Sequence, residues 1–110
     1  MAYNVPLFRK AMEAIEADLR SWDQNWYLIT QPGCGTTMCL AGHALVQSGQ
    51  YEVDHDTMFH AETSAPITIA EAAMRELGID PREARVLFGN MTRDPAALRT
   101  AIEFVIGERL

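Results

Sequence analysis

The chain has 110 residues, of which 48% are hydrophobic and 22% are charged. This length suits one domain, and the composition is that of a folded globular protein rather than a disordered chain. Nine basic residues stand against fifteen acidic ones, which gives a formal net charge of -6. The overall basic character that is typical of nucleic-acid-binding domains is therefore absent.

The first expected element is a helix over residues 5–22. Asn4 is a suitable N-cap, and Pro6 is tolerated in the first turn. Apolar residues then recur at helical spacing, while charged residues fall on other faces. These apolar residues are Leu7, Ala11, Ile15, Leu19 and Trp22. Residues 23–34 are expected to form a loop, with a short extended piece at residues 28–30.

A second helix is expected from Met38 to about Gln47. Thr36 or Thr37 would cap its start, and Gly49 would end it. Small residues dominate this helix, and it contains Gly42. Because a glycine inside a helix costs about 1 kcal/mol relative to alanine, we expect another element to approach closely there. The expected neighbour is Trp22 or Trp26.

The last third of the chain predicts three further helices. They start at Thr68, at Pro81 and at Pro95, and the third continues to the last residue. Each start has a capping signal: a Thr-x-x-Glu box, an Asp-Pro-x-Glu sequence and an Asp-Pro pair. Glycines follow the first two helices. The chain is therefore predicted to form one all-α domain over residues 1–110, an irregular bundle of about five helices. A long loop is expected at about residues 50–66, where alternation at Tyr51, Val53 and His55 is a weak strand signal.

Charge is unevenly distributed along the chain. Residues 34–66 carry four acidic residues and no lysine or arginine, whereas the flanking thirds are each nearly neutral. Trp and Tyr are common anchors of protein interfaces, and they occur in the preceding loop. We therefore expect an aromatic and acidic surface to bind a protein partner. Its candidate residues are Trp26, Tyr27, Tyr51, Asp54 and Asp56.

The same segment contains both cysteines and all three histidines. Cys39 and His43 are four residues apart, so on a helix they face the same side, and Cys34 lies in the preceding loop. Thiolate and imidazole groups are zinc ligands, and these three residues are the candidate metal site. A cysteine at a helix start is also a candidate nucleophile, which leaves an enzyme using Cys34 or Cys39 as a third alternative.

A further alternative is a loose helix-turn-helix pattern over residues 68–88. Arg75, Arg82 and Arg85 would project from its two helices, but acidic residues lie among them and would repel phosphates. The first helix is also long for this motif. The sequence therefore disfavours nucleic acid as the partner.

The run Cys34-Gly35-Thr36-x-x-Cys39-x-Ala41-Gly42 resembles a family of small uncharacterised proteins from actinobacteria and their phages. The family commonly has the pattern C-G-T-x-x-C-x-A-G-W-A, and this chain has His43 where the pattern has tryptophan. A weaker likeness continues through residues 73–88. The resemblance implies a compact fold and a phage source. It implies no activity.

No catalytic set is complete in the sequence, so we expect a non-enzymatic protein that binds another macromolecule, most simply a protein. No apolar run approaches the roughly 20 residues of a membrane span, and no signal peptide is recognisable. A cytoplasmic location with reduced cysteines is therefore expected. Self-association stays open, as do zinc binding and, less favoured, DNA binding.

Overall fold

The structure, a computed structural model, describes residues 3–19, 22, 29–31, 35–37, 39–54, 57–88 and 94–110. This part of the chain holds five helices and two small antiparallel hairpins. The helices are α1 (Val5–Ala17), α2 (Leu40–Ser48), α3 (Ile69–Leu77), α4 (Pro81–Phe88) and α5 (Pro95–Ile106). The strands are β1 (Ile29–Gln31), β2 (Gly35–Thr37), β3 (Tyr51–Asp54) and β4 (Thr57–His60).

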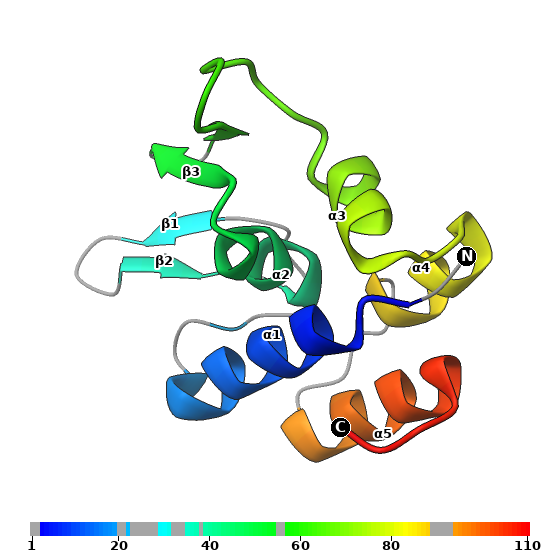
Figure 1. The fold of residues 1–110 in the computed structure, drawn as a ribbon. Coiled ribbons are helices and arrows are strands. Elements are labelled where there is room, and N and C mark those ends of the chain that lie inside the picture. The colour runs from blue at the N-terminus through cyan, green and yellow to red at the C-terminus, as the bar shows by residue number, and fades with distance from the viewer. Residues whose placement is uncertain are drawn as a thin grey trace.

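The helices form an irregular bundle in which α2 is central. It packs against α1, α3 and α4, while α5 packs against α1 and α4 from the other side. Both hairpins lie on the α2 side of α1, remote from α5 (Figure 1). The prediction of a mainly helical fold with about five helices is confirmed, and the two hairpins are additions to it.

The central position of α2 follows from its small side chains. Its first six residues are all buried, and three of them are alanine or glycine. Small residues allow neighbouring backbones to approach, and Gly42 is buried in this stretch. Trp22 packs partly buried against the core. Its proximity to Gly42 stays a prediction, and Trp26 lies outside the described residues.

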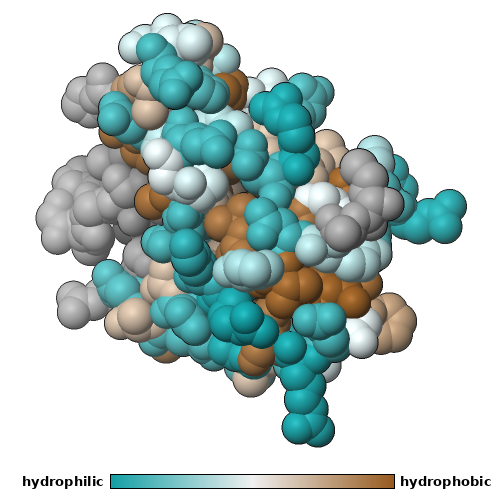
Figure 2. Space-filling view, in the orientation of Figure 1, coloured by the Kyte–Doolittle hydropathy of each residue, from teal (hydrophilic) through white to brown (hydrophobic). Residues whose placement is uncertain are grey.

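Large apolar side chains from all five helices and from β4 fill the interior. The fully buried ones are Phe8, Met12, Ile15, Cys39, Leu40, Leu45, Met58, Leu77, Leu87, Leu98 and Ile102. Figure 2 shows a hydrophobic area in the middle of the face seen in Figure 1, with hydrophilic side chains around it. Removal of the buried apolar side chains from water is the main force that holds the bundle together.

In the first half of the chain, two predicted helix boundaries were wrong. The first helix ends at Ala17 and not at residue 22, because Asp18 has an extended backbone with φ -147°. Leu19 was expected on the buried face but is 53% exposed. The second helix begins at Leu40 with Cys39 as its N-cap, so neither Thr36 nor Thr37 caps it.

Thr36 and Thr37 lie instead in β2, which pairs with β1. Threonine has two preferences: it caps helix starts, and its branched side chain favours extended backbone. The prediction followed the first preference, and the structure follows the second. The expected extended piece at residues 28–30 is confirmed in part, since Ile29–Gln31 forms β1.

The start signals of the last three helices are confirmed in position. In α4, the Glu83 backbone N–H donates to Asp80 Oδ1 (2.8 Å), and the Asp80 N–H donates to Glu83 Oε1 (3.0 Å). In α5, the Asp94 side chain accepts from the Ala96 N–H. Thr68 precedes α3 but makes no side-chain capping bond there, so the predicted capping box is not formed.

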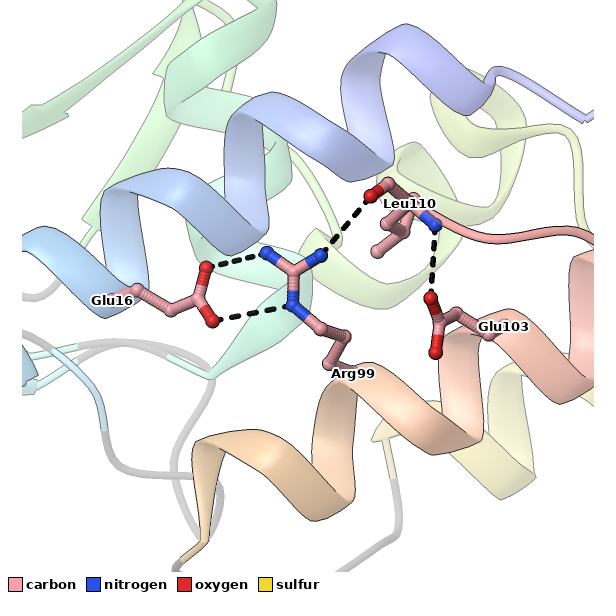
Figure 3. A network of polar contacts seen from close by, with 4 residues as sticks. All are labelled: Glu16, Arg99, Glu103 and Leu110. Atoms are coloured by element: carbon pink, nitrogen blue, oxygen red, sulfur yellow. Dashed lines mark hydrogen bonds and ion pairs between the residues drawn. The ribbon is translucent and has the colours of Figure 1, made fainter.

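The fifth helix ends before the last residue, contrary to the prediction. Gly107 takes a left-handed conformation (φ 78°) that closes α5 after Ile106. The chain then folds back, and Arg99 connects it to α1 (Figure 3). Arg99 donates to both Glu16 carboxylate oxygens, at 2.6 and 3.2 Å, and to the Leu110 backbone oxygen at 3.3 Å. The hydrogen bond to Glu16 raises the pKa of Arg99 above its ordinary value.

Asn4 joins the start of α1 to the end of α3. Its side-chain oxygen accepts from the Leu7 N–H (3.3 Å), which caps α1 as predicted. Its side-chain nitrogen donates to the Glu76 backbone oxygen (3.0 Å), and its own N–H donates to the Leu77 oxygen (2.9 Å). One residue thus satisfies a donor at a helix start and acceptors at a helix end.

Candidate functional site

The acid-rich segment contains a hairpin rather than the long loop that the sequence predicted. β3 and β4 pair antiparallel, with Tyr51 opposite His60, Glu52 opposite Phe59 and Val53 opposite Met58. Side chains alternate between the two faces of such a hairpin. The weak alternation signal therefore did mark a strand at Tyr51 and Val53, and its third residue, His55, lies outside the described residues.

One face of the hairpin lies on the core. Tyr51 and Met58 are 6% and 2% exposed, and the Tyr51 and His60 rings meet edge to face with centroids 5.4 Å apart. The Tyr51 hydroxyl donates to Glu76 Oε1 (3.3 Å) and accepts from Arg75 Nη2 (3.5 Å). The hydrogen bond to Tyr51 raises the pKa of the Arg75 guanidinium above its ordinary value. Tyr51, a predicted binding residue, thus anchors the hairpin to α3 through its side chain.

The other face carries the exposed side chains. Glu52 and Thr57 are exposed there, and Phe59 is half-buried. Asp54 ends β3, and only its backbone belongs to the described structure. The Glu52 carboxylate, one of the acidic groups of this segment, therefore lies on the surface of the hairpin.

The two edges of the hairpin are in different states. On β4, the His60 N–H donates to the Ala65 oxygen (2.9 Å), and the Ile67 N–H donates to the Met58 oxygen (3.3 Å). A bridge between Phe59 and Pro66 continues this contact. The segment 65–67 thus covers the edge of β4.

The edge of β3 has no such cover within the described structure. The Ala61 N–H donates to the Gln50 oxygen (3.0 Å), so residues 50 and 61 form a hydrogen-bonded pair. Hydrogen-bonded and non-hydrogen-bonded pairs alternate along an antiparallel hairpin, so the pairs of Tyr51 with His60 and of Val53 with Met58 are non-hydrogen-bonded. By that alternation, the N–H and C=O groups of Tyr51 and Val53 point away from β4. In the part of the chain that the structure describes, these four groups have no hydrogen-bond partner.

Cys39 and His43, the predicted metal ligands, lie one helical turn apart at the start of α2. The His43 N–H donates to the Cys39 backbone oxygen (3.1 Å), and both residues are buried, at 1% and 4% exposure. The third candidate, Cys34, lies outside the described residues. Across the described ranges, no three His, Cys, Asp or Glu side chains come together in an arrangement that could hold a metal ion. Zinc binding stays an untested alternative.

Three predicted protein-binding residues also lie outside the described residues. These are Trp26, Tyr27 and Asp56. Of the five candidates, the structure therefore places Tyr51 and the backbone of Asp54, both on β3.

The loose helix-turn-helix pattern corresponds to α3 and α4. Arg82 and Arg85 are exposed on α4, as the pattern requires. Glu83 lies between them, and the Tyr3 hydroxyl donates to its carboxylate. Arg75 binds Tyr51 on the hairpin. The arginines that remain for the DNA-binding alternative are Arg82 and Arg85, and the acidic Glu83 lies between them in the sequence.

Two surface features escaped the sequence analysis. Phe104 on α5 is 85% exposed, because the buried positions Leu98, Ile102 and Ile106 place it on the opposite side of the helix. A polar recess of ≈ 200 Å³ lies at the junction of α1, α2 and α3, with Lys10 and Glu76 among its lining residues. The helical period would have revealed the first; the second depends on how three helices meet.

Comparison of the chain with protein-family models, with curated proteins and with solved structures found no match. None of the helices in the described ranges has both the length and the apolar character needed to cross a membrane. The structure thus defines a small, mainly helical domain with an acidic hairpin on its surface.

Proposed function

We propose that this chain is a small, intracellular, non-enzymatic protein that acts by binding another protein through the β3–β4 hairpin. The family resemblance of residues 34–42 supports an origin in a phage of actinobacteria, where the partner would be a host or phage protein. The observation that carries the proposal is the hairpin itself. Its core face is fixed by Tyr51 and Met58, and its outer face presents Glu52.

A rigid support under an exposed, charged surface is the usual arrangement of a recognition site. The hairpin has this support, because Tyr51 is hydrogen-bonded to Glu76 on α3. Segment 34–66 contains four acidic residues and no basic one. Partners with a basic surface are therefore attracted, and their association should weaken with salt.

Quantitative affinity capture from an actinobacterial lysate tests this proposal. The bait is the full chain, compared with a Glu52→Lys variant and with a Glu13→Lys control. Glu13 is an exposed acid on α1, so the control has the same change of charge away from the hairpin. We expect a protein that is enriched by the wild type and by the control and lost with Glu52→Lys. Equal enrichment by both variants, or none by the wild type, contradicts the proposal.

The zinc alternative has one observation in its favour, the adjacent and buried Cys39 and His43 at the start of α2. Elemental analysis of the purified protein tests it. Stoichiometric zinc that is lost in a Cys39→Ser variant would support a metal site. Absence of zinc from protein purified without chelator would exclude it.

A further inference from the structure

The unpaired edge of β3 is a template for another strand. Tyr51 and Val53 each direct an N–H and a C=O away from β4, and the described part of the chain offers these groups no partner. Strand edges with unpaired N–H and C=O groups pair readily with extended peptides, and proteins often block them with lysine or proline. β3 contains neither residue. Along β3, Glu52 is exposed, Val53 is half-buried and Tyr51 is 6% exposed, so access to this edge is greatest at residues 52 and 53.

The side chains along this edge define what an added strand would contain. On the core face, the neighbours are Tyr51 and Val53, which pack against the apolar interior. On the outer face, the neighbour is the exposed Glu52. Since side chains of adjacent strands pair across the sheet, an added strand gains most by alternating apolar and basic residues.

We propose that the edge of β3 binds an extended basic peptide segment of its partner by strand addition. This inference rests on the proposed protein-binding function and specifies how the partner is recognised. Main-chain hydrogen bonds to Tyr51 and Val53 hold the peptide, and lysine or arginine residues beside Glu52 select it. The hairpin then becomes a three-stranded sheet.

A second copy of this chain fits the edge poorly. Two β3 strands would bring Glu52 and Asp54 of each copy to the shared sheet, and segment 34–66 contains no basic residue to balance them. Like charges on neighbouring strands are destabilising. Charge therefore favours a basic partner over self-association.

Val53→Pro is the most direct variant. Proline removes the outward N–H of residue 53, and because that group does not bond to β4, the hairpin ladder stays intact. Val53→Ala is the matched control, since it shortens the side chain and keeps the N–H. The circular dichroism spectrum and melting curve of each variant establish whether it is folded.

The probe is a fluorescent hexapeptide with alternating lysine and valine, acetylated and amidated at its ends. We expect it to bind the wild type and Val53→Ala, and to bind Val53→Pro about tenfold more weakly, as for the loss of one main-chain hydrogen bond. A glutamate-valine hexapeptide and a lysine-valine hexapeptide with N-methylated valines should not bind.

Amide hydrogen exchange on the wild-type protein gives a result that does not depend on any variant. Bound peptide should slow the exchange of the Tyr51 and Val53 amides about tenfold or more, because both become hydrogen-bonded. Unchanged exchange at these two amides, or equal affinity of Val53→Pro and Val53→Ala, overturns strand addition. A dimer that Val53→Pro dissociates would overturn the basic-peptide occupant and assign the edge to a second copy.

Failure of this inference is distinguishable from failure of the proposed function. A protein captured by the wild type, lost with Glu52→Lys and retained by Val53→Pro would keep the function and exclude strand addition. A wild type that captures nothing, and yet shows the amide protection with the peptide, would keep the edge site and remove the support for a cellular partner.

Discussion

In α1, α4 and α5, a side chain from Asn4, Asp80 or Asp94 accepts a hydrogen bond from a backbone N–H at the helix start. The β3–β4 hairpin is built differently: main-chain bonds join its strands, and one face only is buried. The identity of many side chains therefore matters for the helices, whereas the outer face of the hairpin can change at little cost to the fold. We expect substitutions to affect stability in the first region and binding in the second.

The largest effect is expected from Phe8→Ala in α1. Phe8 is fully buried, and replacement of a core phenylalanine by alanine typically costs about 3–5 kcal/mol. Phe104→Ala is a matched control with the same chemical change at a side chain that is 85% exposed, and it should stay within about 0.5 kcal/mol of the wild type. Urea denaturation measures both. Similar costs for the two variants would show that the described core does not carry the stability.

Gly42→Leu tests helix α2, which connects the two regions because it contacts both the other helices and β3. Gly42 is buried, so a leucine side chain must displace its neighbours at a cost of about 1–3 kcal/mol. The melting temperature should fall by several degrees, and Gly42→Ala should give a smaller change of either sign. An unchanged melting curve for Gly42→Leu would mean that no element approaches this glycine closely.

Much of the helical region was predictable because its signals are local. Proline and acidic residues at helix starts, and apolar residues at helical spacing, identified α3, α4 and the start of α5. The errors arose where a residue type has two preferences. Thr36 and Thr37 can cap a helix or lie in a strand, and the pairing with β1 that decides between these roles is not visible in the local sequence.

The candidate site was less predictable, for a different reason. Its charge was visible, since acidic residues cluster at 52–62. Its edge was not, because the free N–H and C=O groups of Val53 depend on which strand faces residues 65–67. Backbone groups are identical in every residue, so only the register of the hairpin reveals them. Tyr51 shows the same limit, since an aromatic residue expected at an interface anchors the hairpin on Glu76 instead.

A smaller effect is expected at Asn4, where the helices are joined. Loss of an N-cap costs about 1 kcal/mol, so Asn4→Ala should lower the free energy of unfolding by about that amount. Asn4→Asp keeps the acceptor for the Leu7 N–H and loses the donor to the Glu76 oxygen, so its cost should be intermediate. If Asp and Ala at this position cost the same, the capping bond contributes nothing to stability.

The contact between Tyr3 and Glu83 on α4 makes the stability of the protein depend on pH. Its hydroxyl donates to the Glu83 carboxylate, and that hydrogen bond raises the pKa of Tyr3 in the folded state. The contribution is therefore complete below the ordinary tyrosine pKa of about 10, and it is lost as the pH rises through the higher folded value. Tyr3→Phe should be less stable than the wild type near neutral pH, and the difference should shrink above about pH 10. A difference that is constant from neutral to alkaline pH would show that the phenol makes no such bond.

The smallest effect on stability is expected from Glu52→Lys on the hairpin. Glu52 is exposed, and its replacement reduces the excess of negative charge, so the free energy of unfolding should change by no more than about 0.5 kcal/mol. The same variant should weaken binding of the basic hexapeptide, and added salt should weaken wild-type binding in the same way. A marked loss of stability would mean that the outer face of the hairpin takes part in the fold. The division between a stabilising helical region and a binding hairpin would then fail at the residue on which it depends most.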